Sequence, residues 1–291
     1  MAGEGDRRSD PEVERRSRLL GGLHFEGEGA RGVAIALLST AIFVTVVIVA
    51  VTQSAGWPEV KRTFFDWGDI SSSFPDIARA FKLNVKIFLV AEAVILVFAL
   101  GVAMLRSLPG PVFFPIRAIA IIYTDVFRGL PTILVITMLA LGVPALQLTG
   151  VPVSAVFWAT VGLILVYSAY VAEVYRAGIE SVHPSQEAAA RSLGLSRWQT
   201  LRYVIVPQAV RRVIPPLLND FIGLQKDTAL VAFAGPVEVL RQAGIDEAAN
   251  FNFTPYVCTA VLFLALTIPM TRATDWLIER DRRKRAASGV A

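Results

Sequence analysis

Polar and ionisable side chains interrupt the apolar stretches of this sequence, and they are the groups best suited to bind a solute. The candidates are Arg128, Asn219, Asp220, Lys226, Asp227 and Thr228. Polar groups persist at membrane depth where they line a cavity or pair with one another. A guanidinium such as that of Arg128 binds a carboxylate through two parallel hydrogen bonds. These residues are therefore candidates for a path that carries a small charged solute.

Each of these charges also has an internal explanation. Lys226 could form an ion pair with Asp220 or with Asp227. Arg128 lies three residues after Asp125, which places both side chains on one helix face. Such pairs would stabilise the fold without touching a solute, and the sequence leaves both alternatives open.

Bond chemistry has no comparable support in the sequence. The chain has one cysteine and two histidines, and neither histidine lies in a metal-ligand pattern. No His, Asp and Ser groups converge on facing apolar stretches, as an intramembrane enzyme would require. The phosphate-binding pattern G-x-x-x-x-G-K-[ST] does not occur. We therefore expect no catalytic residue, no metal site and no cofactor in this chain.

The composition and the apolar stretches predict an all-α integral membrane protein with six transmembrane helices. Hydrophobic residues make up 54% of the chain, and its small net charge of +4 does not indicate a nucleic-acid partner. The stretches long enough to cross a bilayer are 32–52, 81–105, 118–143, 153–175, 212–233 and 254–278. Residues 1–31 are predicted to be a disordered cytoplasmic tail, and residues 279–291 a basic cytoplasmic tail.

Prolines and charges refine this outline. Gly129 and Pro131 predict a kink in the third span, and Pro215-Pro216 a break in the fifth. Residues 53–79 are expected to form an external loop with aromatic anchors. The arginine-rich insert between the fourth and fifth spans and the basic C-terminal tail place that insert and both termini in the cytoplasm.

The insert carries the signals of two short helices joined by a glycine turn. Ser185 suits the N-cap of the first helix, and Gly194 stands where a glycine ends it. Ser196 and Gln199 form the pattern of a capping box for the second helix. Pro207 is expected to end or kink that second helix.

The motifs of this insert resemble those of a known family. The segment QEAAARSLGLSRWQTLRYVIVPQA resembles the "EAA" loop of permease subunits of bacterial ABC importers. The stretches RRVIPPLLNDFIGLQKDTALVAFAGPVEVL and FRGLPTILV resemble the polar amino-acid type of this family, and the likeness covers roughly residues 81–277. In one departure, Ala188 stands where the family has glutamate, and Glu187 is displaced by about 100° around a helix.

The resemblance implies a function and a set of partners. The chain would be the permease of an ATP-driven importer, forming the path for a polar amino acid. Its partners would be an ATP-binding subunit, a second permease that is identical or paralogous, and an extracytoplasmic solute-binding protein. ATP would be bound by the partner subunit. The implied core is residues 81–278, preceded by an extra transmembrane helix over 32–52, in a bacterial cell membrane.

The residues expected to couple the ATP-binding subunit lie in the insert. They are Gln186, Glu187, Ala188, Ala189, Gly194 and Leu195. A short amphipathic helix can place apolar residues in a partner's groove, and Leu193, Leu195, Trp198 and Leu201 could do so here. Alternatively, the insert is a helical hairpin that lies on the lipid headgroups.

The sequence is also compatible with other functions. The closest alternative is an importer permease for another small polar solute, such as an opine. An intramembrane enzyme would need a catalytic constellation that the sequence lacks. A structural or sensory membrane protein could use the insert as a docking arm, and it would need no ATP-binding subunit.

Overall fold

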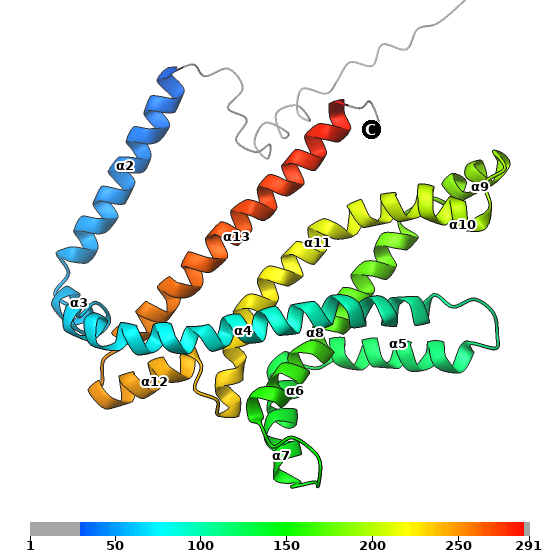
Figure 1. The fold of residues 1–291 in the computed structure, drawn as a ribbon. Coiled ribbons are helices and arrows are strands. Elements are labelled where there is room, and N and C mark those ends of the chain that lie inside the picture. Colours follow the sequence, from blue (N-terminus) through cyan, green and yellow to red (C-terminus); the bar gives the residue numbers. More distant parts are fainter. Residues whose placement is uncertain (1–29, 288–291) are drawn as a thin grey trace, which may run out of the picture. The chain divides into compact units, whose positions relative to one another are not determined.

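The computed structural model describes residues 30–287, and every regular element in that range is helical (Figure 1). The longer α-helices are α2 (Ala30–Thr52), α4 (Trp67–Arg106), α5 (Phe114–Gly129), α8 (Ala155–Glu180), α11 (Val206–Asp227), α12 (Val239–Asn250) and α13 (Thr254–Ala287). The shorter ones are α3 (Trp57–Phe64), α6 (Thr132–Thr137), α7 (Val143–Ala145), α9 (Pro184–Ser192) and α10 (Arg197–Thr200). Two π-helices, η1 (Met138–Gly142) and η2 (Leu201–Ile205), and the 3-10 helix η3 (Thr228–Ala234) complete the elements of residues 30–287.

The chain divides into two compact units, Met1–Val60 and Lys61–Ala291. In the first unit, α2 coincides with the predicted first span and is apolar on all sides, as expected of a helix surrounded by lipid. The tail predicted over residues 1–31 lies almost wholly outside the described residues.

The core of the second unit is built around α8. Its buried small residues Ala159, Gly162, Ala169 and Ala172 allow α4, α5, α6 and α11 to approach closely. A Cβ on Gly162 would lie only 3.1 Å from Ile136 Cα, so a glycine favours the close contact with α6. Packing of small residues holds together a bundle whose outer surface remains apolar.

The number of membrane-crossing helices is only partly settled by length and composition. Four of the described helical segments are long and apolar enough to cross a membrane, and a fifth counts if a bent pair is one span. That pair joins Phe114–Gly129 to Thr132–Ala145 with a bend of 105°, which confirms the kink predicted at Gly129 and Pro131. The remaining predicted span corresponds to α11, which is too polar to pass on composition, so the count of six stays a prediction.

Two features differ from the expectations. Residues 53–79 do not form a loop: α3 and the first turns of α4 occupy most of them, and the Asp66 carboxylate caps α4 by accepting the Asp69 N–H at 3.0 Å. In addition, α11 is not broken at Pro215-Pro216. The change of helix type comes instead at Thr228, where η3 begins.

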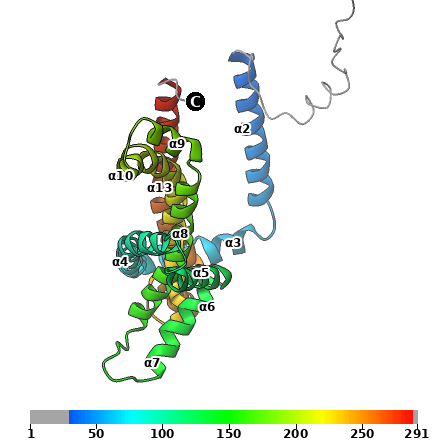
Figure 2. The same ribbon diagram turned by 90° about the vertical axis from the view of Figure 1, so that its right-hand side faces the viewer.

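The second unit has two distinct ends. Both views place α9, α10 and the end of α13 at one end and α7 at the other (Figures 1 and 2). In Figure 1, α12 lies at the end that is remote from α9 and α10. The insert and α12 therefore lie at opposite ends of the second unit.

Candidate functional site

The insert forms a helical hairpin whose first helix begins earlier than predicted. The N-cap of α9 is His183, not Ser185, and its Nδ1 accepts the N–H of Ser185 at 3.2 Å. Pro184 occupies the first helical position, where a missing N–H costs nothing. The proline therefore moves the helix start two residues upstream.

The turn and the second helix follow the predicted pattern. Gly194 has a φ of 83°, the left-handed region that favours glycine, and the N–H of Leu195 donates to the carbonyl of Ala190 at 3.2 Å. The capping box is confirmed, because the N–H of Ser196 donates to Gln199 Oε1 at 2.8 Å and the N–H of Gln199 donates to Ser196 Oγ at 3.3 Å. These bonds fix the hairpin locally.

Of the two effects expected of Pro207, an end or a kink, the end of the second helix does not occur. The helical chain passes from α10 through the π-helix η2 into α11, where Pro207 is the second residue. A π-helical turn uses wider hydrogen bonding than an α-helix, so it accommodates the N–H that proline lacks. The second helix of the hairpin is therefore continuous with a helix of the bundle.

The predicted coupling residues form an accessible surface on this hairpin. Gln186, Glu187, Ala188, Ala189 and Gly194 are exposed, and Leu195 is partly buried. The adjoining side chains of Leu193 and Trp198 are 84% and 65% exposed. Such large apolar groups at a polar turn mark a surface suited to a partner protein.

A second group of residues lies on α5, α8 and α11; Arg128 and Tyr170 are exposed, and Tyr167 and Asp227 are partly buried. The hydroxyl of Tyr167 donates to Asp227 Oδ2 at 2.8 Å, and the hydroxyl of Tyr170 donates to the carbonyl of Arg128 at 3.3 Å. The two tyrosine rings have centroids 6.4 Å apart, and the Arg128 guanidinium carbon lies 5.8 Å from the Tyr170 centroid. We call Arg128, Tyr170, Tyr167 and Asp227 the polar track.

Arg128 pairs with α8 rather than with Asp125. Its Nη1 lies 3.8 Å from Glu173 Oε2, whereas Arg106 Nη1 approaches the same oxygen to 2.7 Å. Arg176 also donates to both oxygens of Glu173. Glu173 is thus held by two close arginines, while Arg128 remains at the edge of the cluster.

Sequence reasoning missed three of these residues. Tyr167, Tyr170 and Glu173 are spaced three apart along α8 and therefore share one face of that helix. The polar spacing was visible in the fourth predicted span. The groups that this face of α8 contacts, however, belong to helices that are distant in the sequence.

The other predicted path residues are spread over different surroundings. Asn219 and Lys226 are exposed, and no ion pair of Lys226 with Asp220 or Asp227 occurs among residues 30–287. Asp220 Oδ2 is buried without a hydrogen-bond partner in the same range. The carboxylate of Glu92 on α4 is close enough to Asp220 for the two acidic groups to repel each other. The carboxylates of α11 are therefore not neutralised by the lysine next to them in sequence.

Thr228 belongs to a buried network that joins three helices. Asn84 Nδ2 donates to Glu238 Oε2 at 2.7 Å and lies 3.3 Å from Thr228 Oγ1. Asn84 Oδ1 accepts the N–H of Val239 at 3.1 Å. Burial raises the pKa of Glu238, although hydrogen bonds from Asn84 and from main-chain N–H groups oppose the increase. This network anchors η3 and the start of α12 to α4.

Comparison with known proteins assigns this arrangement to one family. Residues 111–283 match the family described as "Binding-protein-dependent transport system inner membrane component". The chain is 31% identical over 220 residues to the probable amino-acid permease protein YxeN of Bacillus subtilis (strain 168), covering 75% of this chain and 96% of the relative. It is also 31% identical over 208 residues to the glutamine transport system permease protein GlnP of Escherichia coli (strain K12), covering 71% of this chain and 93% of the relative.

Solved structures share the fold. A chain in a crystal structure of an amino acid ABC transporter with histidines superposes with a TM-score of 0.67 and 29% sequence identity, covering 74% of this chain and 98% of that chain. A chain of the MetNI methionine ABC transporter in an inward facing conformation superposes with a TM-score of 0.56. Its 18% identity, over 70% of this chain and 95% of that chain, bears on the fold alone.

Proposed function

Because this chain belongs to the family of binding-protein-dependent transport system inner membrane components, we propose that its cargo is a polar amino acid, carried along the polar track. Members of this family are membrane-spanning permease subunits of importers and not enzymes, so the site has to bind and release rather than make bonds. Relatives whose names include amino acids and glutamine support this class of cargo.

The polar track is the observation that carries the proposal. It has a guanidinium at one end, a carboxylate at the other and two tyrosine rings between them. A zwitterionic amino acid needs a cation for its carboxylate and an anion for its ammonium group. Asp220 and Lys226 lie on the same helix as Asp227 and are further charged groups that can bind the amino acid. Asn219, on the same helix, offers an amide. Thr228 contributes through the buried network instead of by contact.

Movement of the amino acid requires the hairpin of α9 and α10. We place the ATP-binding subunit on its exposed surface, with Gln186–Ala189, Gly194 and Leu195 as contact residues. Leu193 and Trp198 supply the apolar groups. Because η2 joins this hairpin to α11 without a break, a displacement of the hairpin is transmitted directly to the helix that carries Asp220 and Asp227.

The remaining assembly follows from the family. An importer permease implies an ATP-binding subunit and a solute-binding protein as partners. We propose that two permease subunits pair across the path, and that the hairpin and both termini face the cytoplasm. In this arrangement residues 81–278 are the permease core, and 32–52 an additional transmembrane helix.

Docking can be tested by enlarging the hairpin surface. Ala189→Trp and Gly194→Leu should abolish retention of the ATP-binding subunit in a pull-down from detergent solution. Gly110→Leu is the matched control, because Gly110 also has a positive φ of 89° but lies in a different loop. Full retention of the ATP-binding subunit by both hairpin variants would disprove docking at this surface.

Cargo is tested by reconstitution. The chain, its ATP-binding subunit and, in turn, binding proteins loaded with single amino acids are combined in proteoliposomes, and ATP hydrolysis is measured. Stimulation by one loaded binding protein identifies the cargo. A stable complex that no loaded binding protein stimulates would retain the docking role and remove the amino-acid assignment.

A further inference from the structure

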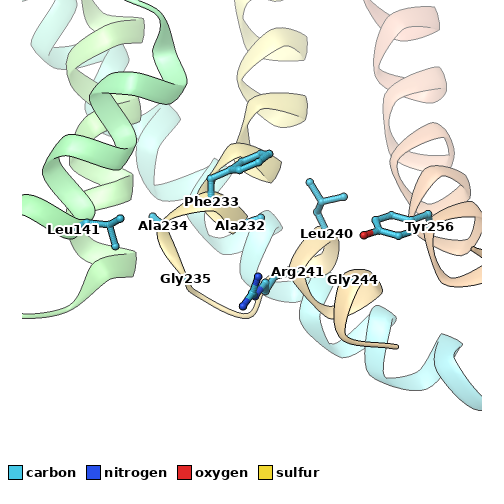
Figure 3. A pocket seen from close by; sticks show the side chains of 9 residues that line it. All are labelled: Leu141, Ala232, Phe233, Ala234, Gly235, Leu240, Arg241, Gly244 and Tyr256. Carbon is cyan, nitrogen blue, oxygen red and sulfur yellow. The ribbon is translucent and has the colours of Figure 1, made fainter. Parts of the chain in front are cut away.

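A pocket of about 560 Å³ opens beside α12, apart from the polar track. Figure 3 shows Leu141 of η1 on one side of it, Leu240 and Tyr256 on the other, and the chain from Ala232 to Gly235 between them. Most of the lining is apolar, and Arg241 supplies its only charged side chain among the described residues. Pockets of this size and character bind small organic molecules through a few polar groups.

The Arg241 guanidinium is available for a ligand. No ion pair or side-chain hydrogen bond of Arg241 occurs in the part of the chain that the structure describes. An arginine without a carboxylate partner, placed beside an apolar wall, presents two parallel N–H donors to an anion. The matching ligand is a small carboxylate with some apolar surface.

The position of Arg241 is set by the buried network. Its main-chain N–H donates to Glu238 Oε1 at 2.8 Å, and Glu238 is completely buried against Asn84 of α4. Gly244, one turn further along α12, lies under Tyr256, since a Cβ there would approach the Tyr256 hydroxyl to 3.1 Å. The first turns of α12 are thus anchored, which fixes the main chain from which the Arg241 side chain extends into the pocket.

The pocket lies where a solute would arrive. It is at the end of the bundle remote from the α9–α10 hairpin (Figure 1), and η3, which forms one wall, continues directly from Asp227 of the polar track. Phe233, in the same wall, is exposed. With the hairpin in the cytoplasm, the pocket faces the binding protein and lies before the track.

We propose that this pocket is an outer substrate site, in which Arg241 holds the carboxylate of the amino acid between its release by the binding protein and its passage into the polar track. The inference rests on the proposed function, because it takes the cargo to be an amino acid that arrives from outside. It adds to that function one residue, Arg241, and one step, the binding of the amino acid before it enters the polar track.

The test measures ATP hydrolysis and uptake of labelled amino acid in the same proteoliposomes. In Arg241→Gln, the amino acid released by the binding protein is not retained. The ATP hydrolysed per amino acid transported should then rise about tenfold, the effect of losing one charge-assisted bond. The concentration of loaded binding protein that half-maximally stimulates ATP hydrolysis should stay unchanged. Arg241→Lys, which keeps the charge without the planar fork, should give an intermediate ratio.

Arg79→Gln is the control, because Arg79 is an exposed arginine near the start of α4 that is paired with Asp76. An unchanged ratio of ATP to amino acid in Arg241→Gln would overturn the inference. So would a weaker response to the loaded binding protein in that variant, since Arg241 would then contact the protein and not its cargo. If the wild-type complex responds to no loaded binding protein, the proposed function itself fails, and that result is distinct from either outcome.

Discussion

At the scale of single residues, the contacts of two tyrosines orient the charged groups of the polar track. Asp227 is held by Tyr167, while the Arg128 guanidinium lies over the Tyr170 ring at the edge of the Glu173 cluster. Asp227 has no ion-pair partner among the described residues, and Arg128 keeps only the long contact of 3.8 Å to Glu173, so both charges can still bind an oppositely charged solute. The two ends of the polar track are therefore both positioned and accessible.

Removing the Tyr167 hydroxyl should impair transport by releasing Asp227. We expect Tyr167→Phe to lower the uptake rate about fivefold, which corresponds to about 1 kcal/mol for one hydrogen bond. Tyr170→Phe is the control, because its hydroxyl makes a longer bond of 3.3 Å to a main-chain carbonyl. It should change uptake by less than about twofold. Equal effects of the two substitutions on uptake in proteoliposomes would argue against a specific role for Asp227.

Glu173 should matter for stability, because three arginines converge on it. Its side chain is 22% exposed, and replacing it by glutamine leaves Arg106 without its counter-charge and leaves Arg176 paired with Glu180 alone. We expect Glu173→Gln to destabilise the protein by about 1.5–3 kcal/mol. The effect is measured as a lower unfolding temperature in detergent.

The control for Glu173 is the exposed pair of Glu279 and Arg283, whose side chains are 52% and 79% exposed. Glu279→Gln should change stability by less than about 0.5 kcal/mol, because solvent screens an exposed pair. If both glutamine variants unfold at the wild-type temperature, the arginine cluster contributes nothing measurable to the fold.

At the scale of elements, α8 and α11 cross most closely just before the insert. A Cβ on Gly178 would lie 2.0 Å from Val213 Cγ1 and 3.4 Å from the carbonyl oxygen of Ala209. Arg212 of α11 also donates to the carbonyl of Ser181 at the end of α8. This crossing joins the two bundle helices that flank the hairpin, so it constrains how the hairpin can move.

A larger side chain at the crossing of α8 and α11 should destabilise the protein, and a smaller one opposite it should restore the stability. We expect Gly178→Ala to cost about 1–3 kcal/mol, and Gly178→Ala with Val213→Ala to recover most of that loss. Gly101→Ala is the control, because nothing lies within 4 Å of a Cβ there. It should be neutral or stabilising by about 0.5–1 kcal/mol, as for alanine in a helix interior. Additive effects in the thermal unfolding of the double variant would refute the close contact.

At the scale of the whole molecule, the two units have different bases for stability. The buried side chains of the described residues begin at Ser73, all within the second unit, whereas none of the apolar window in α2 is buried. The span Gly32–Thr52 carries no charge, so it derives its stability from lipid and from its own main-chain hydrogen bonds. The second unit accordingly contains the packing on which its own fold depends.

The sequence of α2 should therefore be replaceable. Exchanging residues 33–51 for an uncharged leucine-alanine helix of the same length keeps the number of spans. The unfolding temperature should change by less than about 2 °C, since no buried contact is lost. A comparable exchange in α8 serves as the control and should prevent folding. Loss of a stable protein after the α2 exchange would mean that side chains of α2 are needed for the core.

The sequence by itself determined the class of the protein, its local signals and its family motifs. Apolar stretches, the glycine turn at Gly194, the capping box of Ser196 and Gln199, and the kink at Gly129 and Pro131 depend on neighbouring residues alone. The turn, the capping box and the kink are confirmed for that reason, whereas the count of six spans stays a prediction. The start of α9 lies two residues upstream of the predicted one because Pro184 takes the first helical position and His183 becomes the N-cap.

The tertiary structure decided which polar groups meet. Asp125 and Lys226 were the obvious sequence neighbours for the charged path residues. Arg128 lies instead beside Glu173, and Asp227 bonds to Tyr167, 60 residues away. Such pairings depend on how α5, α8 and α11 cross, and the crossings are set by small residues such as Gly178. Local spacing carries no information about those approaches, because they arise from packing between helices that are distant in the chain.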